Sequence, residues 1–231
     1  MVKNSSMRGF FSEYGHIETV TYKDQAYQLI KEAILYQKFQ AGVTYSQEFL
    51  CQELGISRTP VREALLELQK EGYVQFFRGK GIQVVSLDQD SIQDILEVRL
   101  YLEQISAVLA AKRASIEDVA SIRECLDQQQ HNPDSENIDF CYRLDHQFHR
   151  AIAKATHNKH LFQMLNSTLD HYLRFEMLSI YNNVKDASAI LNEHSEIYDA
   201  ISTHNEEKAG EMAKMHLRNA YHRTLSQYWK E

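Results

Sequence analysis

Glycine is nearly absent from the second part of this chain of 231 residues, where Gly210 is the only one beyond residue 86. Because glycine often ends or interrupts a helix, its absence leaves long stretches suited to helix formation. Residues 131–137 and 155–159 are the clearest breaks. Apolar residues at helical spacing predict six helices, over residues 90–113, 115–129, 137–156, 158–181, 186–204 and 206–229. We therefore expect residues 88–231 to form an all-helical bundle.

Shorter elements are predicted at the start of the chain. Residues 1–20 lack periodicity, so we expect a flexible tail there, and the first helix begins at Tyr22. A second helix covers residues 47–54, and Gly55 suits the left-handed conformation that often ends a helix. The intervening residues 39–46 are predicted to form a loop.

The third helix begins in the sequence SRTPVREALLELQ, residues 57–69. Its apolar residues fall on one face, and Pro60 fits the first turn, where a backbone N–H has no helical partner in any case. Two β-prone runs follow and flank the tripeptide GKG at 79–81, which is a hairpin signal. This order of elements predicts a winged helix-turn-helix over residues 21–87.

Charge is distributed unevenly between these two parts. The net charge is −7, which argues against nonspecific binding to nucleic acid by the whole surface. Residues 1–87, however, hold ten Lys/Arg and nine Asp/Glu, whereas residues 88–231 hold 15 and 23. Any DNA-binding surface is therefore expected in the first part.

The cysteines and the apolar runs indicate the compartment. Cys51, Cys125 and Cys141 are odd in number and form no CxxC pair, so neither a disulfide framework nor a thiolate zinc site is expected. No apolar run approaches the roughly 20 residues of a membrane span. The first residues also lack the features of a secretory signal. We expect a cytoplasmic protein that does not contact the membrane.

Seven residues are candidates for contacts with DNA. The second helix of a helix-turn-helix enters the major groove, and its N-terminal residues reach the bases and phosphates. Arg58 and Arg62 share one face there, and arginine can bind guanine or phosphate with two parallel hydrogen bonds. A solvated charged face is the alternative, but the order of elements favours DNA. The candidates are Ser57, Arg58, Thr59 and Arg62 in the helix and Arg78, Gly79 and Lys80 in the hairpin.

Three of the eleven histidines, His149, His194 and His216, lie within inward-facing apolar stripes. Asp145 lies one turn before His149, and a carboxylate and a histidine at this spacing can hold one metal ion from a single helix. The other two histidines would complete a site whose N and O ligands suit a divalent ion such as Zn, Ni or Mn. The alternative is that each histidine is a hydrogen-bonded core residue, but their number favours a metal site.

Two arginines are candidates for binding an effector. Arg99, in EVRLYLE, lies near the inward face, and a buried arginine can bind a carboxylate. A structural pair with Glu103, one turn away, is an equal alternative. Arg174, in HYLRFE, is the second candidate. Glu193 and Glu196 flank His194 but are predicted to lie off the inward face, so no carboxylate is evident as a dedicated catalytic base.

The stretch LCQELGISRTPVREALLELQKEGYVQFFRGKGIQVV, residues 50–85, closely resembles the DNA-binding domain of the GntR family of bacterial transcriptional regulators. The resemblance implies that Arg58 and Arg62 contact operator DNA and that Gly79 and Lys80 form the tip of the wing. Another family contact comes from the preceding helix, at a position that is often arginine, whereas this chain has Glu48. The proline-glycine pair that usually precedes that helix is also missing.

The second part resembles the helical effector-binding (FCD) domain of the FadR-type branch of the same family, and its helices are similar to those of the six-helix subgroup. The matching stretches are EVRLYLEQISAVLAAKRAS (97–115), DHQFHRAIAKATHN (145–158), HSEIYDAI (194–201) and HL (216–217). In the metal-binding members, one aspartate and three histidines hold a divalent ion that helps to bind a carboxylate effector. By motif, these positions are Asp145, His149, His194 and His216. Six other histidines match nothing and are expected at the surface: His146, His157, His160, His171, His204 and His222.

Taken together, the sequence predicts a mainly α protein with an N-terminal winged helix-turn-helix and a C-terminal all-helical bundle. We expect a homodimeric, ligand-responsive repressor that binds a double-stranded DNA operator with an inverted repeat, a divalent metal ion and a small carboxylate effector. A metal-dependent hydrolase is one alternative, because an open Asp/His site can activate water, although no H-E-x-x-H motif is present. A winged-helix module that binds protein is the other.

Overall fold

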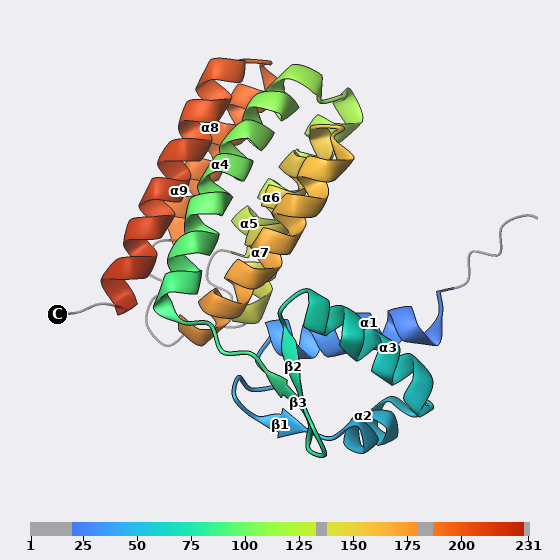
Figure 1. Cartoon of the computed structure of the whole chain (residues 1–231). Helices are drawn as coiled ribbons and strands as arrows, with labels where there is room; N and C mark the ends of the chain where they lie inside the picture. The colour runs from blue at the N-terminus through green and yellow to red at the C-terminus, as the bar shows by residue number, and fades with distance from the viewer. Residues whose placement is uncertain (1–19, 133–137, 180–186, 229–231) are drawn as a thin grey trace, which may run out of the picture. The chain divides into compact units, whose positions relative to one another are not determined.

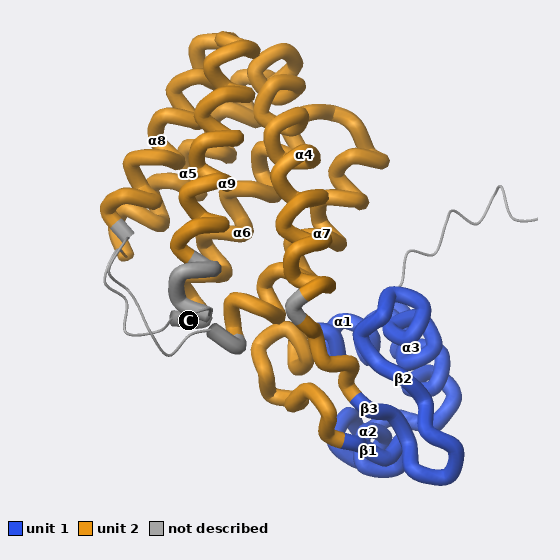
Figure 2. Tube along the Cα trace, turned by 60° about the vertical axis from the view of Figure 1, so that its left-hand side comes forward, with its two compact units in different colours: residues 1–31, 44–83 blue, residues 32–43, 84–231 orange. Residues whose placement is uncertain are grey.

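The computed structural model describes residues 20–132, 138–179 and 187–228. These residues form two compact units (Figure 2). The smaller unit holds the described residues up to Lys31 together with Thr44–Gln83, and the larger unit holds the remainder. The predicted tail lies outside the described residues except for Val20, and the predicted domain boundary after residue 87 stays a prediction.

The smaller unit contains the predicted helices of the helix-turn-helix (Figure 1). They are α1 (Tyr22–Leu35), whose first part belongs to this unit, α2 (Gln47–Leu54) and α3 (Arg58–Lys70). The hydroxyl of Ser46 caps α2 by accepting a hydrogen bond of 3.0 Å from the backbone N–H of Phe49. Gly55 ends α2 with a φ of 64°, the left-handed conformation expected of it.

A three-stranded sheet completes this unit, in the order β1-β3-β2. The strands are β1 (Thr44–Tyr45), β2 (Val74–Phe77) and β3 (Gly81–Val84). The prediction of a loop over residues 39–46 is therefore wrong at β1, which pairs antiparallel with β3. Its partner is far along the chain, so no local pattern marks it. A β-carbon on Gly81 would lie 2.2 Å from the carbonyl oxygen of Tyr45, which is why the strands can approach here only at a glycine.

Six helices form the larger unit within the part of the chain that the structure describes (Figure 1). They are α4 (Gln89–Arg113), α5 (Ile116–His131), α6 (Ile138–Ala155), α7 (Lys159–Ser179), α8 (Ala187–Ser202) and α9 (Glu206–Tyr228). Each described end lies within two residues of its prediction. Helix α4 packs against α6, α7, α8 and α9, while α5 packs against α6 and α8. The predicted fold class is confirmed.

The core of the bundle combines large side chains on some helices with small residues on others. Phe148 and Ile152 of α6 meet Ile197 and Ile201 of α8, and alanines of α4 and α9 fill the remaining space. The one glycine of this part, Gly210, lies where α9 approaches α4. A β-carbon there would lie 2.7 Å from Cγ2 of Val108, so this contact requires the smallest residue.

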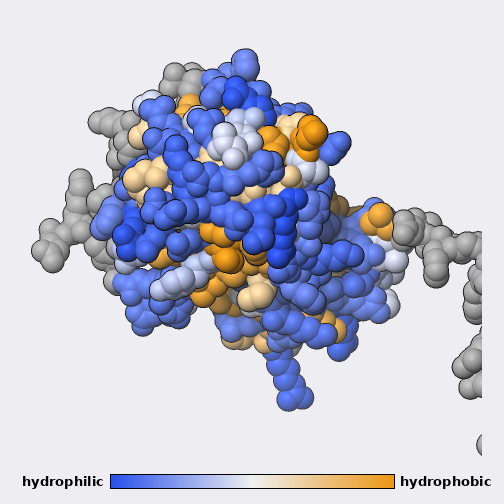
Figure 3. Space-filling model, turned by 90° about the horizontal axis from the view of Figure 1, so that it is seen from above, coloured by the Kyte–Doolittle hydropathy of each residue, from blue (hydrophilic) through white to orange (hydrophobic). Residues whose placement is uncertain are grey.

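Three further features of the described residues concern the cysteines, one face of the surface and the apolar character of the helices. The three cysteines are free. The face shown in Figure 3 is mainly hydrophilic, with hydrophobic residues in small areas between hydrophilic ones. Among the described helices, none is both long and apolar enough to pass through a lipid bilayer.

Candidate functional site

Helix α3 presents two arginines in its first two turns. Its inward face is buried, so the opposite face is left for other contacts; the buried residues are Val61, Ala64, Leu65 and Leu68. Ser57 occupies the N-cap position, but its side chain makes no capping hydrogen bond. Arg58 and Arg62 are exposed, as are Ser57 and Thr59. All four predicted DNA-contacting residues of the helix are therefore accessible.

The hairpin that follows α3 is short and its tip is exposed. Arg78, Gly79 and Lys80 connect β2 to β3, and the backbone N–H of Lys80 donates a hydrogen bond of 3.1 Å to the carbonyl of Phe77. All three connecting residues are exposed, which agrees with a wing whose tip carries two positive charges.

Glu48, which stands where the family often has an arginine, lies beside Arg58. One of its carboxylate oxygens is 3.7 Å from Nη2 of Arg58, and the two side chains are 67% and 75% exposed. An exposed ion pair of this kind contributes little free energy because water competes with it. The guanidinium of Arg58 therefore stays available to a phosphate or a base.

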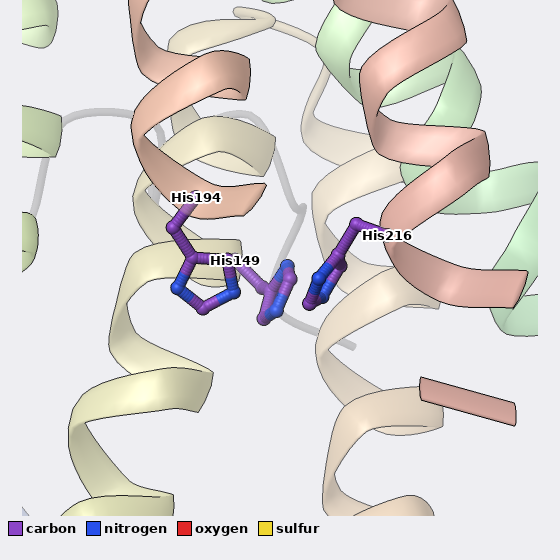
Figure 4. A group of neighbouring side chains, drawn as sticks. All are labelled: His149, His194 and His216. Carbon is purple, nitrogen blue, oxygen red and sulfur yellow. The ribbon is translucent and has the colours of Figure 1, made fainter. Parts of the chain in front are cut away.

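The larger unit brings three histidine rings together in its interior. His149 of α6, His194 of α8 and His216 of α9 turn toward one another, each from a different helix (Figure 4). One nitrogen from each ring lies within 4.8 Å of those of the other two. All three side chains are buried, with at most 2% of each residue exposed. This spacing allows one ion to be bound by all three rings.

Asp145 completes the group that the sequence predicts. Its two carboxylate oxygens each lie 3.6 Å from an Nε2 atom, one from that of His149 and the other from that of His194. The structure therefore places Asp145 beside two of the three histidines, while the described group whose ligand atoms all lie within 4.8 Å of one another holds the histidines alone. Within the described residues, the Nε2 atoms of all three histidines are buried and have no hydrogen-bond partner.

The other nitrogen of each ring, Nδ1, faces an acceptor outside this group. His149 Nδ1 lies 2.5 Å from Glu103 Oε2, His194 Nδ1 lies 2.7 Å from Gln129 Oε1, and His216 Nδ1 lies 2.7 Å from Glu193 Oε2. No pattern in the sequence selects Gln129. Glu193 is predicted to lie off the inward face, and this prediction is wrong. Its side chain is only 11% exposed and reaches from α8 to His216 of α9.

Burial keeps two of the rings, those of His194 and His216, in the form that binds metals. It lowers the pKa of His194 well below its usual value, and the charges of His216 and His149 lower it further. Burial also lowers the pKa of His216, although the hydrogen bond to Glu193 acts in the opposite direction. Both rings are therefore neutral near pH 7, and a neutral imidazole has a lone pair to donate.

Arg99 and Arg174 are both buried in the larger unit. Arg99 Nε lies 2.5 Å from Glu103 Oε1, and its guanidinium lies over the ring of Tyr172 at 4.2 Å from the centroid. The structural pair with Glu103, one of the two alternatives for Arg99, is thus formed. Arg174 donates a hydrogen bond of 2.5 Å from Nη2 to the carbonyl of Val85.

His146 contradicts its prediction, since it is wholly buried rather than at the surface. Residue 146 lies on the side of α6 that packs against α7, where its Nε2 is 2.6 Å from Glu176 Oε2. Burial lowers the pKa of His146 to about 3 and raises that of Glu176 to about 8. Both groups are therefore mainly neutral near pH 7.

Five other histidines are also predicted at the surface. Four of them, His157, His160, His204 and His222, are exposed, whereas His171 is half-buried.

Two protein-family models match the chain. The model for bacterial regulatory proteins of the gntR family matches residues 22–84, and the FCD domain model matches residues 94–219. The first match covers the helix-turn-helix and its wing. The second covers the three histidines and Asp145.

Relatives with a described role are transcriptional regulators rather than enzymes. The Glc operon transcriptional activator of Escherichia coli (strain K12) is 30% identical over 195 residues, which are 75% of this chain and 76% of the relative. The Uxu operon transcriptional regulator of the same organism is 28% identical over 216 residues, which are 85% of this chain and 84% of the relative. The hydrolase alternative therefore has no support among them.

A solved structure shows the same fold. That of E. coli McbR/YncC is 19% identical in sequence and superposes with a TM-score of 0.81, covering 91% of this chain and all of its own. The two family matches and the relatives identify the same kind of protein, and the fold is consistent with them. The chain therefore belongs to the GntR family of bacterial regulatory proteins, and it is a transcriptional regulator with a winged helix-turn-helix and an FCD domain.

Proposed function

We propose that this regulator holds a divalent metal ion between Asp145, His149, His194 and His216 and responds to a small carboxylate effector that binds at this ion. The observation that carries the proposal is the set of three buried Nε2 atoms that lack a hydrogen-bond partner among the described residues. A buried polar atom without a partner costs about 1–3 kcal/mol, and three that converge are best explained by a shared ligand. A metal ion would bind all three lone pairs at once.

The four ligands suit an ion that keeps positions open. A tetrahedral zinc ion would be closed by these four ligands and would be structural. A six-coordinate ion would leave two positions, which a carboxylate could occupy with both oxygens. Mixed N and O ligation suits Zn, Ni or Mn, and we propose an open site because it couples the ion to an effector.

Charge supports a carboxylate as the effector. Residues 88–231 hold 15 Lys/Arg against 23 Asp/Glu, so the ion would be a concentrated positive charge within an acidic domain. Arg99 and Arg174 are the proposed additional anchors, since both are buried positive groups of the same unit. Arg99 also contacts Glu103, whose other oxygen binds His149, so it lies close to the proposed ion.

We propose that the protein acts as a homodimeric repressor whose two winged helices occupy an inverted repeat. Binding of the effector would change the relative placement of the two heads and thereby change operator affinity. Three large apolar residues on one face of α4, Val98, Tyr101 and Ile105, are 47%, 63% and 43% exposed. Pairing of two chains about a two-fold axis would cover such a face.

The first prediction concerns the DNA-contacting arginines. Replacing Arg58 or Arg62 with alanine should cost roughly 1–3 kcal/mol of specific DNA affinity if the residue binds a base. Both side chains are exposed, so helical content and metal content should not change. A titration at fixed salt with DNA from the protein's own promoter region measures the effect. Wild-type affinity in the double variant would contradict the assignment.

The second prediction concerns the dimer. The double variant Val98→Glu/Ile105→Glu should sediment as a monomer, because each chain would bring two charges into the proposed interface. Ile116→Glu is the matched control, since Ile116 of α5 is 87% exposed and lies outside this face. Footprinting of the wild type should show both half-sites of an inverted repeat protected. A wild-type monomer that protects a single half-site would rule out the proposed symmetry.

The third prediction connects the metal to the effector. His194→Ala should lose the bound metal and the response to small organic acids together, because the same ion would bind both. The α3 arginines are unchanged in this variant, so DNA affinity without effector should stay close to that of the wild type. Elemental analysis followed by calorimetry with small organic acids tests both losses. A variant that loses its metal but binds the acids with wild-type affinity would show that the ion is purely structural.

A further inference from the structure

We infer that Glu103, Gln129 and Glu193 are positioning residues, which hold His149, His194 and His216 in the one tautomer that directs a lone pair at Nε2 toward the centre of the group. The inference rests on the proposed function in one respect, because that lone pair is useful only if a metal ion binds there. Each of the three residues comes from a different helix than the histidine it contacts: Glu103 from α4, Gln129 from α5 and Glu193 from α8.

The physical basis is that a neutral imidazole carries its proton on only one nitrogen. The partner of one nitrogen therefore decides the state of the other. An ionised carboxylate can only accept a hydrogen bond, so Glu103 and Glu193 require the proton of His149 and of His216 to be on Nδ1. Their Nε2 atoms are then unprotonated and able to bind a metal.

Both carboxylates are kept ionised by further contacts. Glu193 accepts hydrogen bonds from Arg223 and from the side-chain amide of Asn219, and donors of this kind stabilise the ionised form of a carboxylate. Arg223 reaches both of its oxygens, at 2.9 and 2.8 Å. Glu103 is paired in the same way, because its Oε1 lies 2.5 Å from Nε of the buried Arg99. Arg99 thus acts on His149 through Glu103.

Gln129 is the most informative of the three because an amide can both donate and accept. Its Nε2 donates a hydrogen bond of 3.0 Å to the carbonyl oxygen of Leu144, and a carbonyl can only accept. The orientation of the amide is therefore fixed, and its Oε1 must face His194 Nδ1, at 2.7 Å. The proton of His194 is then on Nδ1. One glutamine thus connects α5, α6 and α8 and determines which nitrogen of His194 is available.

Removing a side chain that orients a metal-binding histidine usually lowers metal affinity by about 10–100-fold. Gln129→Leu deletes both functions of the amide, whereas Gln129→Glu keeps an acceptor for His194, loses the donor to Leu144 and adds a negative charge. The two variants therefore separate the role of Gln129 at His194 from its contribution to stability. Gln130→Leu is the matched control, because the next residue of the same helix is exposed.

The experiment uses the full chain, first stripped of metal and then titrated with Zn²⁺ against a competing chelator. Long-range ¹H–¹⁵N correlation of the histidine rings in the metal-free protein reports which nitrogen is protonated. In the wild type and in Gln130→Leu, we expect all three rings to carry their proton on Nδ1. In Gln129→Leu, His194 should move toward the Nε2-protonated form, and Zn²⁺ affinity should fall by roughly 10–100-fold.

Gln129→Glu gives the decisive contrast and serves also if Gln129→Leu fails to fold. It should keep the His194 proton on Nδ1 and keep at least wild-type Zn²⁺ affinity, although its melting temperature falls because the Leu144 carbonyl loses its donor. A wild-type His194 protonated on Nε2 would overturn the inference. So would a Gln129→Glu variant that loses its Zn²⁺ affinity while keeping the tautomer. Rings in the expected tautomer that bind no metal at all would support the positioning roles and instead overturn the proposed metal function.

Discussion

The convergence of three buried imidazole nitrogens is the constraint on which the account of this protein depends. Each Nε2 atom is shielded from water and has no hydrogen-bond partner among the described residues. Leaving such atoms without a partner costs about 1–3 kcal/mol each, so an arrangement that brings three of these rings together needs a compensating interaction. The proposed cation would supply one, and Asp145 would add the negative charge that a site of this kind needs.

The three histidines and their hydrogen-bond partners connect most helices of the larger unit at one place. Helices α6, α8 and α9 carry the histidines, while α4 and α5 carry two of the side chains that orient them. Helix α7 reaches the neighbouring part of α6 through the hydrogen bond between Glu176 and His146. A ligand that changes the coordination of the proposed ion would therefore act on helices from every part of the bundle. This is the kind of shared element that coupling between an effector site and the DNA-binding heads requires.

The sequence predicted the fold and the four ligands because both leave local patterns. Asp145 and His149 stand one turn apart on an inward face, and His194 and His216 interrupt apolar stripes, so periodicity alone selects them. Gln129 leaves no such signal, because a glutamine on a helix is ordinary until a histidine of another helix is known to face it. The burial of His146 cannot be predicted from the sequence either, because it depends on how α6 packs against α7. Strand β1 was missed because its pairing with β3 is not local.

X-ray absorption spectroscopy of the purified full-length protein tests the central claim most directly. We expect one firmly bound divalent first-row metal per chain, surrounded by nitrogen and oxygen with the multiple-scattering signature of about three imidazoles. For zinc, the nitrogen atoms should lie at about 2.0–2.1 Å. A protein that binds no metal after incubation with Zn²⁺, Ni²⁺ and Mn²⁺, or a metal held by sulfur ligands, would contradict it.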